Sequence, residues 1–545
     1  MLLVRGRLLY PTILLAGLAV LAAGWFFTTD PGGTSSRDRY IEGVIGRPAR
    51  INPLFVAQSN TDADLVALVF DGLTRIDSAG RPQPNLAESW EISPDSVAYT
   101  FRLRRNIFWH DGASFDAIDV AFTIAQLQAP GFRGSPALAA QWQGVRTTII
   151  DAFTIELRLP APSASFLTRA AIGIVPEHLL VGLDAGALFD STFNRAPVGT
   201  GPFALVGLTQ NAVRLERHTG YHLGIPGLRE IELRFFRDHA ALLAALRVGE
   251  VSAALLVDPP STTIVATLGR PVVLAPGTPL ALAATELPLA GYTVLYLNNQ
   301  RTPLNDPRLR QALAAAIDVP TLAAGAGIAT GSAGDGPIVP GSWAYSPTTW
   351  PSVSDAWEFF DDAGWVTTEE GTRSRGDSPL TLQLVTNAEP VREALANLIA
   401  QRLSDHGVTV AVTALPSGEL VTRLLGPREY ELVLFGWETD IDPDPYGAWH
   451  TSQIAPPGGN VAGYHDALSD VLLEAARTTI DDAERLDLYG RFTRRFVETV
   501  PSIVLHYPSR LYTHPRALRG MFPGLLFEPS DRFRSVHLWK ITTPE

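Results

Sequence analysis

Apolar residues in the second half of the chain follow strand and helix spacings in turn. Residues 380–384 alternate between leucine and polar residues, as expected for a strand, and residues 391–403 repeat apolar positions at helical spacing before Gly407. Residues 408–412 and 430–435 predict two more strands, with a short helix near 419–425 between them. This order predicts a parallel sheet with right-handed crossovers.

The remainder of the chain carries similar but shorter signals. Further strands are predicted over residues 99–104, 153–159 and 292–297, and further helices over residues 61–73, 116–127 and 240–248. Thr61 is the expected N-cap of the helix that begins there. Asp306 followed by Pro307 predicts another helix start, because aspartate caps a helix and proline suits its first turn.

The residues that follow the predicted strand 430–435 are the first candidates for a binding site. In open parallel sheets, ligands bind beyond the carboxyl ends of the strands. Gly436 would let the backbone turn, Trp437 offers an apolar wall, and Glu438 and Asp440 offer carboxylates. A rigid wall beside a fixed anion suits a small ligand with an ammonium group. The alternative is a solvated acidic turn whose tryptophan belongs to the core.

Composition narrows the class of protein. The chain has 545 residues, 46% of them hydrophobic and 18% charged, so a large packed core is expected. The net charge of −13, without a basic block, argues against nucleic-acid binding. Cysteine is absent, which excludes disulfides, thiolate metal sites and cysteine nucleophiles. No cofactor and no metal site are predicted.

The amino terminus predicts a membrane anchor. Arg5 and Arg7 precede an uncharged stretch, residues 8–27, which would span roughly 30 Å as a helix. The arginines favour a cytoplasmic start, so the rest of the chain would lie outside the membrane. Trp25 stands where a bacterial lipoprotein carries its lipid-bearing cysteine. We therefore expect an uncleaved anchor over residues 1–29 and a linker over residues 30–40, with cleavage near Ala22 or Ala23 as the alternative.

The chain resembles the family 5 extracellular solute-binding proteins, the oligopeptide- and dipeptide-binding receptors of ABC importers. The family's Gly-Trp-x-x-Asp-x-x-(Asp/Glu)-Pro loop is matched by Gly436, Trp437, Asp440 and Pro445 and, less strictly, by Asp444. Other matching stretches follow in the same order, from about residue 41 to 513: Asn52-Pro53, residues 70–73, residues 84–90, Trp109-His110-Asp111-Gly112, residues 199–203 and Asn298-Asn299-Gln300.

The resemblance implies an α/β, two-lobed fold like that of periplasmic binding proteins (class II, cluster C type) with an extra small domain. Lobe I would comprise residues 41–56, 195–290 and 505–545. The extra domain would comprise residues 57–194, packed on lobe I, and lobe II residues 291–504.

The function implied is that of an extracytoplasmic receptor, anchored or secreted, which captures peptides or similar small polar solutes between its lobes. It would be a monomer that delivers the solute to a membrane permease, and no bond would be made or broken. Asp440 would receive the ammonium of the solute and Trp437 would line the cleft. Pro48 and Ala49, in the loop of residues 47–50, would hold the solute backbone as in strand addition.

Several points stay open on the sequence. His450 is a further candidate for lining the cleft. Leu434 stands where some oligopeptide receptors carry an arginine, so a ligand carboxylate would have to be met elsewhere. A membrane-anchored ligand sensor is one alternative function. A secreted hydrolase that uses two carboxylates among Glu438, Asp440, Asp442 and Asp444 is another.

Overall fold

The computed structural model describes residues 39–56, 59–256, 271–273, 279–326, 328, 330–522 and 524–542. The predicted anchor, residues 1–29, lies outside these residues, as does most of the predicted linker; the first strand begins at Arg39. Within the described part of the chain, no helix is long and apolar enough to cross a membrane.

An eight-stranded sheet forms the part that we call lobe I. Its strand order is β12-β13-β23-β11-β1-β10-β9-β8. The strands are β1 (Arg39–Ile45), β8 (Phe203–Leu208), β9 (Ala212–Arg217), β10 (Glu230–Phe236), β11 (Ala253–Leu256), β12 (Pro271–Val273), β13 (Pro279–Pro288) and β23 (Ser509–Pro515). β1 pairs in parallel with both β10 and β11. Helix α8 (His239–Val248) packs closely on β1, since a Cβ added at Gly43 would lie 2.2 Å from Leu242.

A six-stranded sheet forms lobe II, in the order β15-β22-β14-β21-β19-β20. The strands are β14 (Gly291–Leu297), β15 (Ser332–Ala333), β19 (Thr381–Asn387), β20 (Thr409–Leu415), β21 (Leu432–Glu438) and β22 (Ser502–Tyr507). β19 pairs in parallel with β20 and β21, which confirms the predicted strand–helix–strand order. β14 runs antiparallel to β21 and β22, so the sheet is mixed. β22 continues in this sheet beyond the boundary predicted at residue 504.

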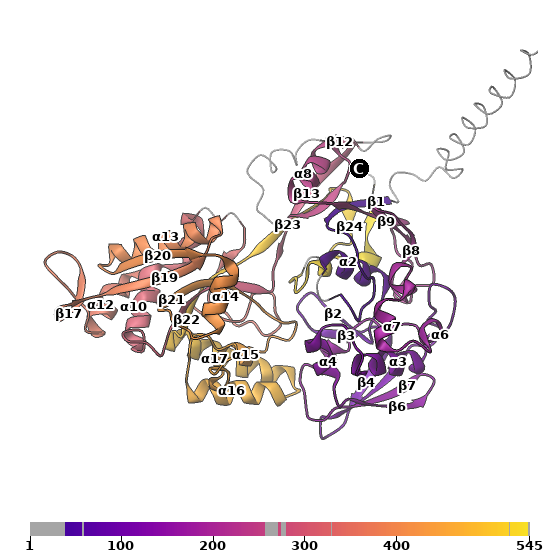
Figure 1. Cartoon of the computed structure of the whole chain (residues 1–545), viewed down its shortest axis with the longest axis horizontal. Helices are drawn as coiled ribbons and strands as arrows, with labels where there is room; N and C mark the ends of the chain where they lie inside the picture. The colour runs from indigo at the N-terminus through magenta and orange to yellow at the C-terminus, as the bar shows by residue number, and fades with distance from the viewer. Residues whose placement is uncertain are drawn as a thin grey trace, which may run out of the picture.

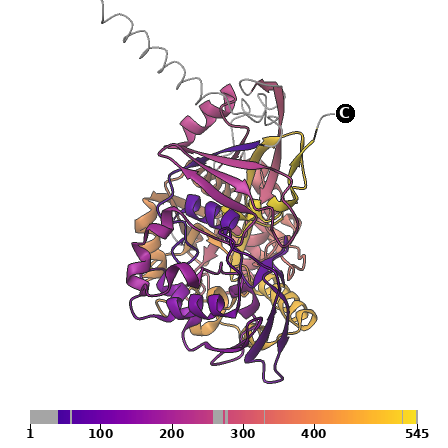
Figure 2. The ribbon, with the colours of Figure 1, turned by 90° about the vertical axis from the view of Figure 1, so that its right-hand side faces the viewer.

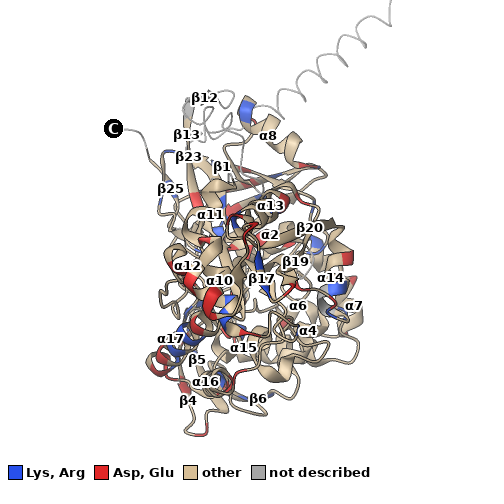
Figure 3. Cartoon of the chain, turned by 90° about the vertical axis from the view of Figure 1, so that its left-hand side faces the viewer, with Lys and Arg blue, Asp and Glu red and all other residues tan. Residues whose placement is uncertain are grey.

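Helices cover the lobe II sheet. They are α10 (Pro307–Ile317), α11 (Val319–Gly325), α12 (Ala356–Asp362), α13 (Pro390–Asp405), α14 (Ser417–Leu425), α15 (Tyr446–Trp449), α16 (Ala467–Thr478) and α17 (Asp482–Thr499), with 3₁₀ turns at Val353–Asp355 and Thr451–Gln453. Asp306 caps α10 through the amide of Arg308, as predicted. A small sheet, β16 (Val366–Thr367), β17 (Arg373–Arg375) and β18 (Ser378–Pro379), lies at one end. Figure 3 shows acidic positions on α12, with both signs of charge on α14.

The extra domain is built on the sheet β4-β5-β7-β6, with the pair β2-β3 beside it. Its strands are β2 (Thr74–Ile76), β3 (Pro82–Pro84), β4 (Ala87–Ile92), β5 (Ala98–Leu103), β6 (Arg146–Asp151) and β7 (Thr154–Arg158). Its helices are α3 (Ala117–Gln128), α4 (Pro136–Trp142), α5 (Phe166–Arg169), α6 (Glu177–Leu180), α7 (Ala185–Phe189) and the 3₁₀ turn Thr192–Arg195. In Figures 1 and 2 this domain lies below the lobe I sheet.

The helix predicted over residues 61–73 begins and ends at other residues in the structure. Helix α2 (Asn60–Val69) is capped by Ser59, whose hydroxyl accepts from the amide of Asp62. Thr61 does not cap it, because its hydroxyl donates to the carbonyl of Ile45 instead. The helix ends at Val69, and the next residue, Phe70, is extended.

The C-terminal segment returns to lobe I. It contains the strands β24 (Leu518–Arg519) and β25 (Lys540–Ile541) and 3₁₀ turns at Pro529–Phe533 and Val536–Leu538. Arg532 in this segment is buried and donates to the carboxylates of Glu42 on β1 and Asp64 on α2. The C-terminal segment is thereby joined to the first strand by buried charge.

The hydrophobic cores divide the molecule into two bodies. One core combines residues of the lobe I sheet with residues of the extra domain, whereas lobe II has its own. Within the described residues the chain crosses between the two bodies at residues 288–291, from β13 to β14, and at residues 507–509, from β22 to β23. Figure 1 shows lobe II joined to the rest at this ribbon. Two bodies linked by a narrow ribbon can move as a hinge.

Candidate functional site

The candidate site begins within strand β21, not after it. The strand continues through Gly436 and Trp437 to Glu438, because β14 pairs with it over its whole length. Gly436 lies opposite Thr293 and is not a turn residue, so the turn expected there is wrong. An added Cβ at Gly436 would lie 2.6 Å from a guanidinium nitrogen of Arg392, which shows that the glycine leaves room for that side chain.

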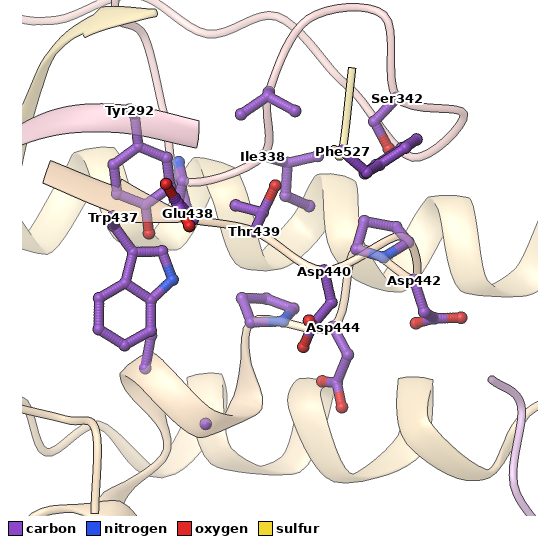
Figure 4. Close-up of a pocket in the computed structure, with 16 residues that line it drawn as sticks. Tyr292, Ile338, Ser342, Trp437, Glu438, Thr439, Asp440, Asp442, Asp444 and Phe527 are labelled. Carbon is purple, nitrogen blue, oxygen red and sulfur yellow. The ribbon is translucent and has the colours of Figure 1, made fainter. Parts of the chain in front are cut away.

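A small cavity of about 120 Å³ opens at this end of β21. Its lining comes from β14, from the loop 337–342, from the loop 439–445, from α15 and from the C-terminal segment, and includes Tyr292, Ile338, Val339, Trp437, Glu438, Thr439, Asp440, Asp442, Asp444 and Phe527. In Figure 4, Tyr292 and Trp437 lie on one side of the cavity, and Asp440 and Asp442 toward the other. The structure therefore places Trp437, Glu438 and Asp440 at one cavity.

The three aspartates of the loop differ in their partners. Arg485 donates to Asp442 at 2.7 Å, and both side chains are buried. Asp444 lies 2.8 Å from Nε of Arg477. Among the described residues, Asp440 has no cation within ion-pair distance and no hydrogen-bond donor. Among the described residues, the cavity thus contains two carboxylates without a counter-ion, those of Glu438 and Asp440.

The surroundings of Asp440 disfavour its negative charge. Partial burial raises the pKa of the Asp440 carboxyl, and the nearby negative charge of Asp442 raises it further. As a whole residue, Asp440 is nevertheless exposed to solvent. A cation placed against this carboxylate would relieve both effects, since it would supply the missing opposite charge.

The geometry does not favour a pair of catalytic carboxylates. Asp442 and Asp444 are each neutralised by an arginine. Glu438 and Asp440 both come from the same end of one strand, whereas glycosidases place their two carboxyl groups on either side of the scissile bond. The described residues contain no group of three acidic or histidine side chains that could hold a metal ion.

Pro48 and Ala49 lie in the loop after β1 and do not line the cavity around Asp440. The amides of Ala49 and Arg50 both donate to the carboxylate of Asp62, at 2.8 and 3.1 Å. Proline has no amide hydrogen. At Pro48 and Ala49, the backbone of the loop can therefore offer carbonyl acceptors to a ligand but no amide donors.

His450 does not lie where we expected. Its ring is buried and stacks on Tyr446, with ring centroids 4.0 Å apart, and Nδ1 lies 2.8 Å from Oγ of Ser452. Nε2 faces Glu474 of α16 at 3.3 Å. The side chain does not line the cavity and instead packs on Tyr446 of α15.

Sequence reasoning missed several lining residues. Tyr292 lies in a predicted strand, and its pairing with Trp437 across β14 and β21 places it at the cavity. Ile338 lies in a loop without a motif, and Phe527 comes from the C-terminal segment. Leu434, at the position of the missing arginine, is fully buried opposite Leu295 and faces the core.

Comparison with known proteins agrees with this architecture. The family model for bacterial extracellular solute-binding proteins, family 5, matches residues 81–456. The oligopeptide-binding protein AppA of Bacillus subtilis is 25% identical over 511 residues, which cover 92% of this chain and 91% of AppA. The glutathione-binding protein GsiB of Escherichia coli is 27% identical over 483 residues, covering 85% of this chain and 88% of GsiB.

A solved structure shows the same fold. NikZ from Campylobacter jejuni, in complex with Ni(L-His), superimposes with a TM-score of 0.67 and 26% identity, over 92% of this chain and 99% of NikZ. The fold is thus the mixed α/β fold of solute-binding proteins, and the family model spans well over half of the sequence. The chain belongs to family 5 of the bacterial extracellular solute-binding proteins.

Proposed function

We propose that this protein captures peptides, or similar small polar solutes with an ammonium group, and delivers them to the permease of an ABC importer. The observation that carries the proposal is the Asp440 carboxylate, which has no cation partner among the described residues and lines a cavity beside Trp437. Asp440 would bind the ammonium group and Trp437 would pack against the adjacent part of the solute.

The energetics fit a small ligand. A charge-assisted hydrogen bond of this kind contributes about 1.5–3 kcal/mol, which corresponds to roughly tenfold or more in affinity. Asp442 and Asp444 already have arginine partners, so they add little net charge to the cavity. An ammonium group can therefore pair with Asp440, which lines the cavity without a counter-ion among the described residues, as Glu438 also does.

The relatives support a solute of this class. Their names describe binding of oligopeptides, as for AppA, and of glutathione, as for GsiB. Both kinds of solute carry an ammonium group and several hydrogen-bonding groups. Because Leu434 is buried, a carboxylate of the solute would need another cation. Arg392, which lies beside Gly436 of β21, is a candidate.

Capture would follow from closure of the two bodies around the solute. The two bodies have separate hydrophobic cores, and within the described residues the chain crosses between them at residues 288–291 and 507–509. Polar contacts also join them, such as the hydrogen bond from the amide of Trp343 to the carbonyl of Ala79. A solute that touches both bodies stabilises the closed arrangement by its differential contacts. The permease would then recognise the closed form.

We also propose that residues 1–29 hold the receptor at the outer side of the cytoplasmic membrane. The support is the sequence pattern alone, with Arg5 and Arg7 before the uncharged stretch of residues 8–27. Mass spectrometry of the protein purified from membranes tests this, because a retained anchor leaves the mass of the full chain. The mass of a chain that begins after Ala22 or Ala23 would contradict the proposal.

Two measurements test the proposed function. Native mass spectrometry of the purified protein should show a co-purified small solute, and its fragmentation would identify it. Calorimetry with the tripeptide Ala-Ala-Ala should then show that Asp440→Asn lowers affinity about tenfold or more. Asp377→Asn, at an exposed site in the loop between β17 and β18, is the matched control and should leave affinity unchanged. Equal affinity in Asp440→Asn and wild type would reject the role of Asp440.

A further inference from the structure

A second cavity lies on the other side of the loop that carries the aspartates. Its volume is about 510 Å³, and it lies between the extra domain and lobe II. The extra domain contributes Gln141, Ser163, Ser165 and Arg169, and lobe II contributes Asp442 and Arg477, among others. Asp442 and Asp444 line both cavities. The turn formed by residues 442–445 therefore separates two adjoining spaces.

Arg169 is the cation of this cavity that lacks a carboxylate partner. It ends helix α5, and the one polar contact recorded for its guanidinium among the described residues is from Nη2 to Oγ of Ser165, at 2.9 Å. No carboxylate of the described chain lies within 4.0 Å of it. A guanidinium has five N–H donors, so most of those of Arg169 are left for a ligand.

The other charged groups of the cavity compensate one another. Arg485 pairs with Asp442, and Arg477 pairs with Asp444. Glu474 also lines the cavity, but its side chain is 63% exposed and faces His450. Among the described charged groups in the buried part of the cavity, Arg169 is thus the one that no neighbouring side chain neutralises.

Burial makes this unpaired charge costly. Desolvation lowers the pKa of Arg169, and the positive charge of Arg477 lowers it further, while Asp442 beyond ion-pair distance acts against both. A bound oxyanion would restore the missing opposite charge, and a carboxylate can meet a guanidinium through two parallel hydrogen bonds.

We propose that this cavity is a specificity subsite in which Arg169 binds an acidic side chain of the solute's first residue. The inference rests on the proposed function, because it takes Asp440 as the site of the solute's ammonium group. Because Asp442 and Asp444 line both cavities, a side chain next to that ammonium group would extend past the 442–445 turn toward Arg169. Solutes with an aspartate or a glutamate at the amino end are therefore preferred.

Calorimetry with two matched peptides, Asp-Ala-Ala and Asn-Ala-Ala, tests the subsite in the full chain. Wild type should bind the aspartate peptide roughly three- to tenfold more tightly, as expected for a partly exposed charge-assisted pair. Arg169→Gln should remove this preference and leave the affinity for Asn-Ala-Ala nearly unchanged. Arg146→Gln, at an exposed site on β6 of the same domain, should keep the wild-type preference.

The possible results separate the two proposals. Equal affinity of wild type for both peptides would overturn the subsite while leaving peptide binding intact. An Arg169→Gln variant that weakens both peptides equally would also overturn it, because Arg169 would then act on lobe closure or on the fold. If wild type bound neither peptide, the proposed function would fail together with the subsite.

Discussion

Arg485 and Asp442 form a buried ion pair, with Nη2 of the arginine 2.7 Å from Oδ1 of the aspartate. Nε of Arg485 also donates to the carbonyl of Ala476, and Nη2 reaches the hydroxyl of Tyr489. The pair holds the loop 439–445 against α17 and removes one negative charge from the cavity. Asp440, two residues earlier, has no such partner among the described residues, so its charge is left for a ligand to neutralise.

The affinity for an ammonium ligand should fall as the pH is lowered. The charged form of Asp440 binds the ligand, and its pKa is raised by burial and by Asp442. The loss of affinity should therefore begin at a higher pH than it would for an ordinary aspartate, and it should continue as the pH falls through the raised pKa. Calorimetry of Ala-Ala-Ala binding between pH 7 and pH 4 measures it.

The Asp440→Asn variant is the control for this titration and should show a flatter profile. Asp442→Asn should move the midpoint of the wild-type profile to lower pH, because it removes a negative charge that raises the pKa of Asp440. A pH dependence that is identical in wild type and Asp440→Asn would assign the effect to another group.

Arg532→Met should destabilise the protein strongly. The substitution leaves Glu42 and Asp64 buried without their shared cation. Breaking a buried ion pair in this way costs about 3–5 kcal/mol. Chemical denaturation should show the loss, whereas Arg519→Met, at an exposed position of the same segment, should have little effect. Similar unfolding midpoints for both variants would argue against the network.

Gly199→Ala should prevent normal packing of the segment 199–201 against α2. A Cβ at this position would lie 1.8 Å from the carbonyl oxygen of Val69, so backbone has to move. We expect a loss of roughly 3 kcal/mol or more, as for other severe overpacking. Gly207→Ala, where no heavy atom lies within 4 Å of the new Cβ, is the matched control and should be nearly neutral in thermal unfolding. Equal melting temperatures of the two variants would show that the segment yields easily.

Asp71 should make the protein less stable as the pH rises toward neutrality. Burial raises the pKa of its carboxyl to about 7, although hydrogen bonds from Asn85 and Tyr221 act against this. Between the unfolded pKa near 4 and the folded pKa, the folded state holds a proton that the unfolded state has released. The contribution of Asp71 to the free energy of unfolding therefore falls with rising pH, by at most about 1.4 kcal/mol per pH unit.

The comparison of wild type with Asp71→Asn isolates that effect. The difference in unfolding free energy between the two proteins should change in favour of the variant from pH 5 to pH 7. Measuring denaturant unfolding at several pH values gives this difference directly. A difference that stays constant over this range would mean that Asp71 is already ionised in the folded protein at pH 5.

Local patterns were enough to predict the strand–helix–strand order from β19 to β21 in lobe II. Leucines at alternate positions predicted β19, and apolar residues at helical spacing before Gly407 predicted α13 (Pro390–Asp405). The mixed character of the sheet was missed, because β14 and β22 pair with partners far away in the sequence. Thr61 is not the cap of α2 as expected, because its hydroxyl donates to the carbonyl of Ile45.

The site was predictable only where one segment carries it. Trp437 and Asp440 follow from the motif in β21 and its loop. Phe527 and Ile338 come from segments without a motif, so their position depends on tertiary packing. Arg169 could not be singled out, since nothing in the sequence tells which of many arginines lacks a carboxylate in the folded chain.

The ribbon between the lobes bears on how the chain could be divided. Pro288 and Ser509 are opposite each other on the antiparallel strands β13 and β23. Lobe II is therefore inserted into the remainder at the position of a hairpin turn. A short loop from β13 to β23 would close lobe I, and the excised insert would keep a sheet and a core of its own, so each half is a natural unit for separate expression.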